Sequence, residues 1–483
     1  MKCKSSIVAA MNVVLLVTLT LPVELAAQQT RYKLIEIPTS GGPSAMGQVD
    51  GPGISQFINN SGVVVGGVDT PAPDPFCLNP DCFIPHAFRW QDGVLTDLGS
   101  LQGMNFSHAT SINSRGWATR GSFTSDLDPL TGQPAEHAVL WKGGKILDLG
   151  ALGTGLESAG LYVNDFGEVI GFSTFDTTPD PSSFKGATIH AFIWRNGVIQ
   201  DLGTLGGSGA SPSGGCNNER AGLVAGSSST SSGESHAFLW DNGKMTDIPT
   251  LGGTSAGAQC ANNQGQVIGQ SNLAGDVDQH AFSWEDGKVI DLRTLGGSFS
   301  QAVWLNNEGQ SVGGATTTND EGFDATLWSK GVVADLGTLS GDCFSIANAI
   351  NSKGQIIGQS FSCDFISRAV LWDKGSIIDL NAAIPPNPTL QLTEPLNIND
   401  HGEIVGRGLP IGCDDLDLCG RVFVLIPCDH ASTQGCEGGP DFTAQPSSAP
   451  VTMTATRGLD SQRTRQFIAR IGARTRGLTR ERR

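Results

Sequence analysis

Histidine is the residue type in this chain whose spacing most invites a chemical interpretation. Five histidines open the same repeated motif, which reads His-Ala followed by an apolar run: His86, His137, His190, His236 and His280. Zinc would need its nitrogen ligands within about 2.0–2.1 Å, whereas equivalent residues of successive units in a large ring lie on the order of 10 Å apart. The pattern therefore predicts structural histidines that hydrogen-bond a loop carbonyl at the start of a strand.

Acidic residues of the variable loops are the second candidate. They are Asp126 and Asp128, Asp276 and Asp278, and Asp414, Asp415 and Asp417. Carboxylates could bind calcium, but none of these runs completes an Asp-x-Asp-x-Asp-Gly loop with its following Glu. Solvated surface charge is the expected role, and calcium is kept as a weak alternative. A carboxylate pair about 5–9.5 Å apart could also cleave a glycosidic bond.

A nucleophile motif occurs once, as Gly-x-Ser-x-Gly at residues 253–257. A nucleophile elbow needs a strand before it and a helix after it, and here β-type repeats lie on both sides. No His-Glu-x-x-His motif and no phosphate-binding loop occurs. We therefore predict no catalytic, cofactor-binding or metal-binding residues, and we favour a protein without enzymatic activity while leaving an enzyme open.

Cysteine usage indicates disulfides. Cys3 precedes the repeats, and ten cysteines follow it: Cys77, Cys82, Cys216, Cys260, Cys343, Cys363, Cys413, Cys419, Cys428 and Cys436. Because no Cys-x-x-Cys occurs, disulfides are favoured over zinc. Three pairs are close in sequence: Cys77 with Cys82, Cys413 with Cys419, and Cys428 with Cys436. Cys343 with Cys363 and Cys216 with Cys260 are plausible further pairs, which sequence alone does not determine.

The chain ends carry their own signals. Residues 1–27 have a basic start, an apolar run and a small-residue cleavage site, which is typical of a secretory signal peptide. No other stretch is apolar enough to span a membrane. Residues 28–436 hold the repeats, residues 437–456 form a Pro/Ser/Thr/Ala-rich linker, and residues 457–483 are a basic tail. We expect a secreted, extracellular or periplasmic protein.

Charge separates the tail from the body. Nine arginines against Asp460 and Glu481 give the tail +7, whereas the whole chain carries −17. The acidic body argues against nucleic acid as a partner. The tail is expected to lack stable structure, since Gly472 and Gly477 weaken a helix, with binding to an anionic envelope surface as the alternative.

These residues belong to one repeated element. Its tryptophan anchors are Trp90, Trp141, Trp194, Trp240, Trp284, Trp328 and Trp372, with steps of 51, 53, 46, 44, 44 and 44 residues. Each unit combines an Asn-x-x-Gly turn, an alternating Val/Gly segment, the His-Ala-Phe-x-Trp segment, an Asp/Asn-Gly turn and an Asp-Leu segment. Short β-rich runs separated by such turns predict four strands, here called A to D, in about 44 residues.

The number of strands predicts an all-β fold, an eight-bladed β-propeller. Eight Asn-x-x-Gly-type turns occur, and residues 421–425 supply a degenerate eighth strand of the tryptophan type. The unpaired N-terminal strand at residues 32–37 is expected to complete the last blade and close the ring, which removes exposed sheet edges. The strand order resembles that of TolB-type propellers. It puts the tight A–B and C–D turns on one face, and the variable B–C loops with the D–A connections on the other.

Together the His-Ala-Phe triplet, the Asp-Leu-Gly-x-Leu-Gly-Gly segment and the Asn-x-x-Gly-x-Val-x-Gly segment resemble the bacterial extracellular repeat family named after its His-Ala-Phe (HAF) motif. The resemblance covers about residues 32–427. The chain departs from the motif at residues 324–326 and 368–370, where the histidine is absent. It implies export and a repeat fold, and no established activity.

The predicted function follows from the variable loops. The B–C loops are long at residues 69–85, 123–136, 174–189 and 408–420 and short at residues 272–279 and 361–367. Such loops on a rigid scaffold usually carry binding specificity. We therefore predict a monomeric binding or scaffold module for an extracellular glycan or envelope protein. The alternatives are a polysaccharide hydrolase or lyase that uses carboxylates on this face, and a purely structural matrix protein.

Overall fold

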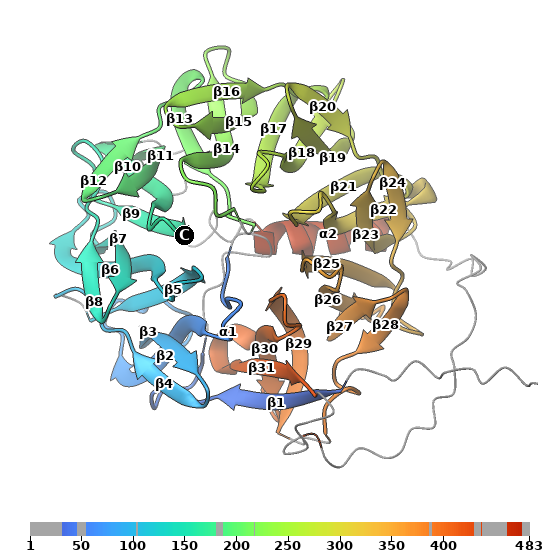
Figure 1. The fold of residues 1–483 in the computed structure, drawn as a ribbon, viewed down its shortest axis with the longest axis horizontal. Helices are drawn as coiled ribbons and strands as arrows, with labels where there is room; N and C mark the ends of the chain where they lie inside the picture. The colour runs from blue at the N-terminus through green and yellow to red at the C-terminus, as the bar shows by residue number, and fades with distance from the viewer. Residues whose placement is uncertain are drawn as a thin grey trace, which may run out of the picture.

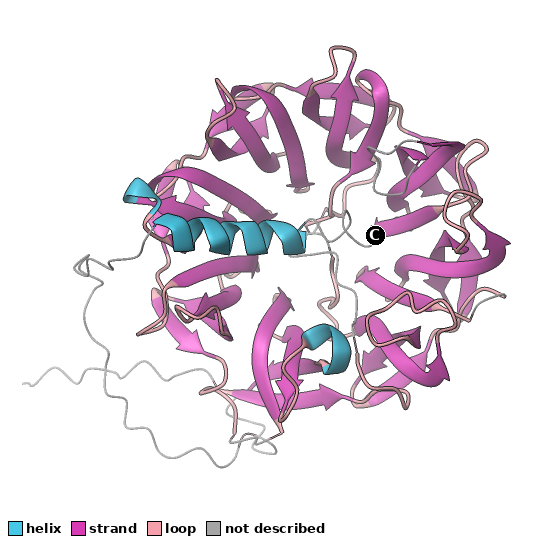
Figure 2. Cartoon of the chain, turned by 180° about the vertical axis from the view of Figure 1, so that it is seen from behind, coloured by secondary structure: helices cyan, strands magenta, loops and turns pink. Residues whose placement is uncertain are grey.

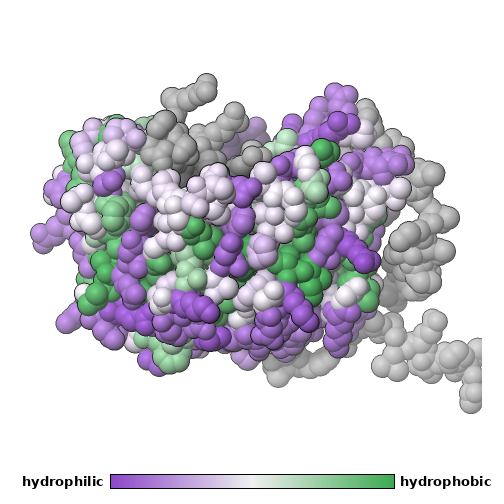
Figure 3. Space-filling model, turned by 90° about the horizontal axis from the view of Figure 1, so that it is seen from above, coloured by the Kyte–Doolittle hydropathy of each residue, from purple (hydrophilic) through white to green (hydrophobic). Residues whose placement is uncertain are grey.

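The chain is a β-propeller. The computed structural model describes residues 31–45, 55–102, 105–179, 187–216, 218–385, 389–428, 436 and 461–475. Short antiparallel sheets stand side by side around a central axis, and the strands of each sheet follow one another outward from that axis (Figure 1). On the side of the ring, hydrophobic patches alternate with hydrophilic ones (Figure 3).

The strands follow one another around the ring in sequence order. The first half holds β1 (Tyr32–Ile37), β2 (Val64–Pro73), β3 (Phe83–Gln91), β4 (Val94–Asp97), β5 (Ser107–Ile112), β6 (Ala118–Leu127), β7 (Pro134–Lys142), β8 (Lys145–Asp148), β9 (Ser158–Val163), β10 (Val169–Pro179), β11 (Ala187–Arg195), β12 (Val198–Asp201), β13 (Gly206–Pro212), β14 (Leu223–Thr230), β15 (Ser235–Asp241) and β16 (Lys244–Ile248). The second half holds β17 (Gly252–Ala261), β18 (Val267–Leu273), β19 (Gln279–Glu285), β20 (Lys288–Asp291), β21 (Gly296–Leu305), β22 (Ser311–Thr317), β23 (Phe323–Ser329), β24 (Val332–Asp335), β25 (Phe344–Ile350), β26 (Ile356–Phe361), β27 (Ser367–Asp373), β28 (Ser376–Asp379), β29 (Leu390–Ile398), β30 (Ile404–Pro410) and β31 (Arg421–Pro427). A 3₁₀ turn, η1 (Thr318–Asp320), and the helices α1 (Leu416–Cys419) and α2 (Ser461–Thr475) complete the described elements.

The N-terminal strand joins the C-terminal repeat. β1 pairs antiparallel with β31 from Tyr32 opposite Pro427 to Ile37 opposite Val422, and the sheet continues through β30 to β29. The backbone N–H of Tyr32 also donates to the carbonyl of Ala383, at 2.9 Å. The two ends of the repeat region are therefore held in one four-stranded sheet.

The Asn-x-x-Gly turns explain the commonest motif of the sequence. In the turn at Asn306, the side-chain Oδ1 accepts the backbone N–H groups of Glu308 and Gln310, at 3.1 and 2.9 Å. Gly309 has φ of +74°, a left-handed conformation that glycine adopts without strain. Asparagine therefore caps the turn that leads from strand A to strand B, and glycine lets the chain reverse.

The repeated phenylalanine and tryptophan pack between and within the sheets, as predicted. Phe88, Phe192, Phe238, Phe282 and Phe423 are fully buried. A Cβ added to Gly226 would lie 2.6 Å from the Phe238 ring, and the equivalent distance from Gly406 to Phe423 is 2.5 Å. Glycine stands on strand B because the aromatic ring of strand C covers the backbone there.

Part of the predicted loop length is strand. β2 runs to Pro73, β6 to Leu127 and β10 to Pro179, so the first three long B–C connections begin as extended hairpins. Antiparallel pairing continues near their tips, as between Leu127 and Pro134. Strand pairing therefore takes up part of the length predicted for these loops, because it resumes near their tips after a break in register.

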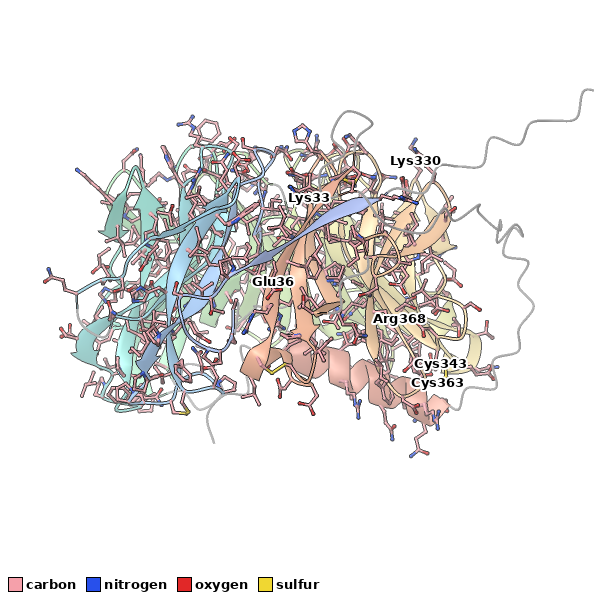
Figure 4. All side chains as sticks on the ribbon, turned by 90° about the horizontal axis from the view of Figure 1, so that it is seen from below. Lys33, Glu36, Lys330, Cys343, Cys363 and Arg368 are labelled. Atoms are coloured by element: carbon pink, nitrogen blue, oxygen red, sulfur yellow. A yellow bond between two sulfur atoms is a disulfide. The ribbon has the colours of Figure 1, made fainter. Side chains whose placement is uncertain are left out.

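The basic tail is helical where the structure describes it. α2 lies across the face of the ring that carries the B–C loops (Figure 2). It is on the same side as Cys343 and Cys363, whereas Lys330, in a C–D turn, is on the opposite side (Figure 4). The expectation of an unstructured tail was wrong for residues 461–475, because Phe467 and Ile471 of α2 are buried against the ring. The predicted signal peptide and the linker lie outside the described residues.

All five proposed disulfides form: Cys77–Cys82, Cys216–Cys260, Cys343–Cys363, Cys413–Cys419 and Cys428–Cys436. This confirms the three close pairs and decides the two that sequence left open. Cys216–Cys260 joins neighbouring repeats, and the other four close local segments. Among the described residues, no helix is long and apolar enough to cross a membrane.

Candidate functional site

The repeated histidines are structural, and the partner that all five share is a carboxylate rather than the predicted carbonyl, which is present in addition at His190. In each of five repeats the histidine Nδ1 lies 2.7–2.9 Å from a carboxylate oxygen of the aspartate that begins the Asp-Leu motif. The five pairs are His86–Asp97, His137–Asp148, His190–Asp201, His236–Asp247 and His280–Asp291. The antiparallel C and D strands bring these residues together, eleven positions apart. The partner is a carboxylate because the D strand ends beside the start of the C strand.

The histidine–aspartate pairs also shape the start of the D–A connection. Asp201 accepts the N–H of Gly203 at 2.8 Å, in addition to its contact with His190. The hydrogen bond to Asp201 raises the pKa of His190, and this outweighs the opposing effect of burial. His190 Nε2 lies 3.2 Å from the Ser208 carbonyl, so both of its ring nitrogens have partners. This geometry fits a structural ion pair rather than a proton shuttle.

The two repeats without histidine use other contacts. Asp324 stands at one of these positions and Arg368 at the other. Arg368 forms a salt bridge with Asp342, which is buried and also accepts the hydroxyl of Ser360. The missing histidine is therefore replaced, in that repeat, by a partly exposed arginine that is paired with a buried aspartate.

The loop aspartates are spread over separate turns. Asp128 accepts the N–H of Leu130, Asp276 accepts that of Thr254, and Asp415 accepts that of Asp417 at the start of α1. Asp417 also lies 2.9 Å from Arg407. Among the described residues, no three His, Cys, Asp or Glu side chains come close enough together to hold a metal ion. The Gly-x-Ser-x-Gly match lies wholly within strand β17, without the elbow that a nucleophile needs.

The repeated turns meet around the axis of the ring. Asn306 Nδ2 donates to the carbonyl of Asn351 in the next repeat, at 3.1 Å, and Asn351 donates to Asn399 at 3.0 Å. Asn399 then donates to the carbonyl of Asn59, at 3.0 Å, across the junction between the last and first repeats. The asparagines at 59, 113 and 262 make the same contact with their neighbours. One side chain thus caps its own turn and joins it to the next.

Two junctions in this asparagine circle are made differently. Asn164 donates to Glu168, whose carboxylate accepts the N–H of Gly222 in the following repeat, at 2.7 Å. Asn218 donates within its own repeat, to the carbonyl of Leu223. The Cys216–Cys260 disulfide connects that repeat to the next one. A covalent bond therefore stands where the amide contact is missing.

A second circle is formed by the residue after each turn asparagine. These residues are all polar: Asn60, Ser114, Asp165, Glu219, Asn263, Asn307, Ser352 and Asp400. The backbone N–H of Asp165 donates to Glu219 at 2.6 Å, and that of Glu219 donates to Asn263 at 2.7 Å. Asp400 accepts the N–H of Ser352 at 2.9 Å and donates its own N–H to Asn60 at 2.9 Å.

These two circles line a pocket of about 220 Å³ on the axis, which we call the axial pocket. Its lining includes four carboxylates, Asp165, Glu219, Glu308 and Asp400, together with several amide and hydroxyl side chains. None of the described lining residues is basic. The pocket lies at the A–B turns, on the face opposite the B–C loops and α2. Sequence reasoning missed it, although the run of polar residues after each turn asparagine was a visible signal.

The carboxylates of the axial pocket differ in charge state. Burial, reinforced by the charge of Asp165, raises the pKa of Glu219 to about 7. Burial acts in the same direction on Asp400, but the hydrogen bonds from Ser352 and Asn60 outweigh it and lower its pKa. At neutral pH the pocket therefore holds ionised Asp400 and a Glu219 that is close to half protonated. A bound cation would favour ionisation of Glu219.

Comparison with known proteins finds similarity in solved propellers. No protein-family model and no curated protein matches this sequence. The propeller domain of the Trilobed protease from Pyrococcus furiosus is 8% identical, with a TM-score of 0.41 over 67% of this chain and 98% of that one. A puromycin-hydrolyzing peptidase of Mycobacterium tuberculosis is 14% identical, with a TM-score of 0.39 over 78% of this chain. This chain spans only 61% of that peptidase. TolB from Acinetobacter baumannii is 11% identical, with a TM-score of 0.31 over 83% of this chain and 97% of TolB.

The predicted function needs correction. Peptidases and TolB proteins, and not glycan-binding scaffolds, are the proteins named above as similar in structure. The axial pocket lies at the repeated turns rather than on the variable-loop face, and α2 covers part of that face. The prediction of a glycan- or envelope-binding scaffold, with its polysaccharide hydrolase alternative, was therefore wrong.

Proposed function

We propose that this protein binds a small ligand through a protonated amine, such as the free amino end of a peptide, in the axial pocket. The observation that carries the proposal is a pocket with four carboxylates and no basic residue among its described lining. An ammonium group carries three donors and no acceptor, so it matches a lining rich in carboxylate and amide oxygens. The net charge of −17 would draw cationic ligands toward the ring.

The pocket size supports a small ligand. A cavity of about 220 Å³ is below the roughly 300–1,000 Å³ of sites that enclose a drug-sized molecule. An amino terminus with one or two residues fits this volume, and the rest of a peptide would extend into solvent. The hydrogen-bonded turns make the site rigid, which lowers the entropic cost of binding.

The proposal includes an eight-bladed ring closed by the N-terminal strand. Eight turn asparagines lie around the axis, and the pairing of β1 with β31 supports a last blade built from both chain ends. The contact from Asn399 to Asn59 supports closure at the same junction. A closed ring would hold the eight polar side chains of the pocket at fixed positions.

Export and family membership are part of the same proposal. Five disulfides fit an oxidising compartment, which agrees with the signal-peptide pattern at residues 1–27. The repeated motifs support membership of the HAF repeat family. A secretion assay with and without residues 1–27 would test export, and retention of the full chain in the cytoplasm would contradict it.

The test of amine binding is a calorimetric titration with Gly-Gly-amide, which has a free amino end, and with its N-acetylated form. We expect saturable binding of the free amine at pH 7, where most of the amine is protonated, and at least tenfold weaker binding of the acetylated peptide. Glu219→Gln and Asp165→Asn should each weaken binding about tenfold or more, through loss of a charged partner. Asp286→Asn, in an exposed hairpin turn, is the matched control and should leave binding unchanged. Equal binding of the two peptides would contradict the proposal, and so would binding of inorganic cations alone.

A further inference from the structure

The tail helix α2 docks into an aromatic socket on the face opposite the axial pocket. The Phe467 ring stacks on Phe344, with centroids 4.5 Å apart and an angle of 10° between the planes. It also contacts Phe361 at 4.9 Å and Phe323 at 5.5 Å. Phe467 is 2% exposed, so this side chain is almost completely enclosed.

The socket is built into the ring. Its walls come from β23, β25, β26 and the loop after β26, which carries Phe365. The Cys343–Cys363 disulfide joins two of these segments and packs in the same apolar cluster. Ile471, one helical turn after Phe467, is 9% exposed and extends the contact. The socket therefore recognises an aromatic and an aliphatic side chain at positions i and i+4 of a helix.

Charge adds to this recognition. The guanidinium of Arg470 lies 4.3 Å from the centre of the Phe365 ring, a cation–π contact. On the other flank of α2, the positive charge of Arg465 favours the ionised form of Asp320. The carboxylate of Asp320 accepts a hydrogen bond from the hydroxyl of Ser298. A basic helix on an acidic ring thus has its apolar side chains buried and its arginines at the edges of the contact.

We propose that this socket is a helix-binding site through which two copies of the protein associate, each binding residues 461–475 of the other. In the structure the helix and the socket belong to one chain, and exchange would keep the same contacts between two copies. Residues 437–460 comprise 24 positions, and an extended chain of that length reaches about 80 Å. Docking within one copy is favoured at low protein concentration, because a tether gives an effective concentration of about millimolar. Exchange is expected at high concentration, or when a copy cannot use its own tail.

The first test uses the peptide Ser461–Thr475 with a fluorescent label and the full-length Phe467→Ala protein, whose socket is intact and whose own tail docks poorly. We expect saturable binding of the peptide. The peptide carrying Phe467→Ala should bind about 30-fold more weakly, from the loss of one buried aromatic side chain. Wild-type protein should bind the labelled peptide more weakly than the Phe467→Ala protein, because its own tail competes. Absence of saturable binding to the Phe467→Ala protein would overturn the proposal.

The second test asks whether two copies associate. Phe365→Gly removes one wall of the socket at a position with φ of +66°, which glycine accepts, and leaves the tail intact. Each variant alone should sediment as a monomer at low concentration. A mixture of the Phe467→Ala and Phe365→Gly proteins should form a one-to-one complex, since one supplies the socket and the other the helix. A mixture that stays monomeric while the peptide binds would show that docking occurs only within one copy and would overturn the exchange.

Discussion

The two faces of the ring differ in what each repeat contributes to them. On the turn face, each repeat contributes an asparagine turn and one polar residue, and these meet around the axis in two circles. On the loop face, the repeats differ in the length of their B–C connections, and the tail helix packs on one sector. The axial pocket, to which each repeated turn contributes a residue, lies on the turn face, whereas a contact particular to two neighbouring repeats forms on the loop face.

This difference shows how position relative to the axis determines what a repeat can build. Side chains near the axis come close to those of every other repeat, so a short polar residue in each turn is enough to line a pocket. Side chains at the outer ends of the loops contact only adjacent repeats. A site there needs large side chains from a few strands, as in the aromatic socket.

The largest expected difference between the faces concerns two disulfides. Removing Cys216–Cys260 by alanine substitution opens a loop of 44 residues at a junction without an asparagine contact, and should lower the free energy of unfolding by about 4 kcal/mol. Removing Cys413–Cys419, on the loop face, opens only six residues and should cost about 2 kcal/mol. Chemical denaturation of the two double variants measures both values. Equal losses would mean that the turn face is no more dependent on its covalent junction than the loop face.

The asparagine circle should be nearly as sensitive. Asn306→Asp keeps the oxygen that caps the turn but removes the amide that donates to Asn351, and puts a charge at a residue that is 1% exposed. We expect a loss of about 2–3 kcal/mol in the free energy of unfolding. Asn307→Asp is the matched control, because this exposed neighbour acts only as an acceptor toward Asn263. A loss below about 0.5 kcal/mol for Asn306→Asp would show that the asparagine contacts between repeats contribute little to the stability of the fold.

The pH dependence of the axial pocket should have a defined sign. Glu219 has a folded-state pKa of about 7, above its value in the unfolded chain, so the folded state binds more protons between about pH 4.5 and 7. Stability contributed by Glu219 should therefore fall as pH rises through this range. Glu219→Gln should remove this part of the slope and be more stable than the wild type at pH 8, by about 1–2 kcal/mol. Asp69, whose pKa burial also raises to about 7, should contribute a similar slope in both proteins. Identical slopes for the two proteins would mean that Glu219 does not titrate in this range.

The histidine–aspartate pairs should give the smallest effect. The pKa of His190 is raised by Asp201, so the pair stabilises the fold below the unfolded-state pKa of histidine, and this contribution is lost as pH rises through the folded value. His190→Gln should cost about 0.5–1 kcal/mol at pH 5.5 and less at pH 9. Thermal unfolding at the two pH values tests this, with Lys330→Gln on the opposite face as a control. A cost that is the same at both pH values would assign His190 a packing role alone.

Much of the fold was predictable from the chain. The alternation of Val and Gly, the Asn/Asp-Gly turns and the regular tryptophan spacing predicted short antiparallel strands in a ring, because each of these patterns acts over a few residues. The close cysteine pairs were predictable for the same reason. Hydrogen-bond partners between repeats were not predictable. The carbonyl predicted for the histidines is a partner of His190, but the carboxylate that the adjacent strand supplies to all five was missed.

The sequence by itself determined the repeat, its turns and the residue types available at each position, since these depend on backbone preferences and local spacing. Only the tertiary structure decided which of those residues meet. Asp165, Glu219 and Asp400 are far apart in the chain and come together because the ring brings every A–B turn to its axis. Phe467 belongs to a tail whose composition disfavours an isolated helix, and that helix exists because burial against Phe344 and Phe361 offsets the entropy of ordering it.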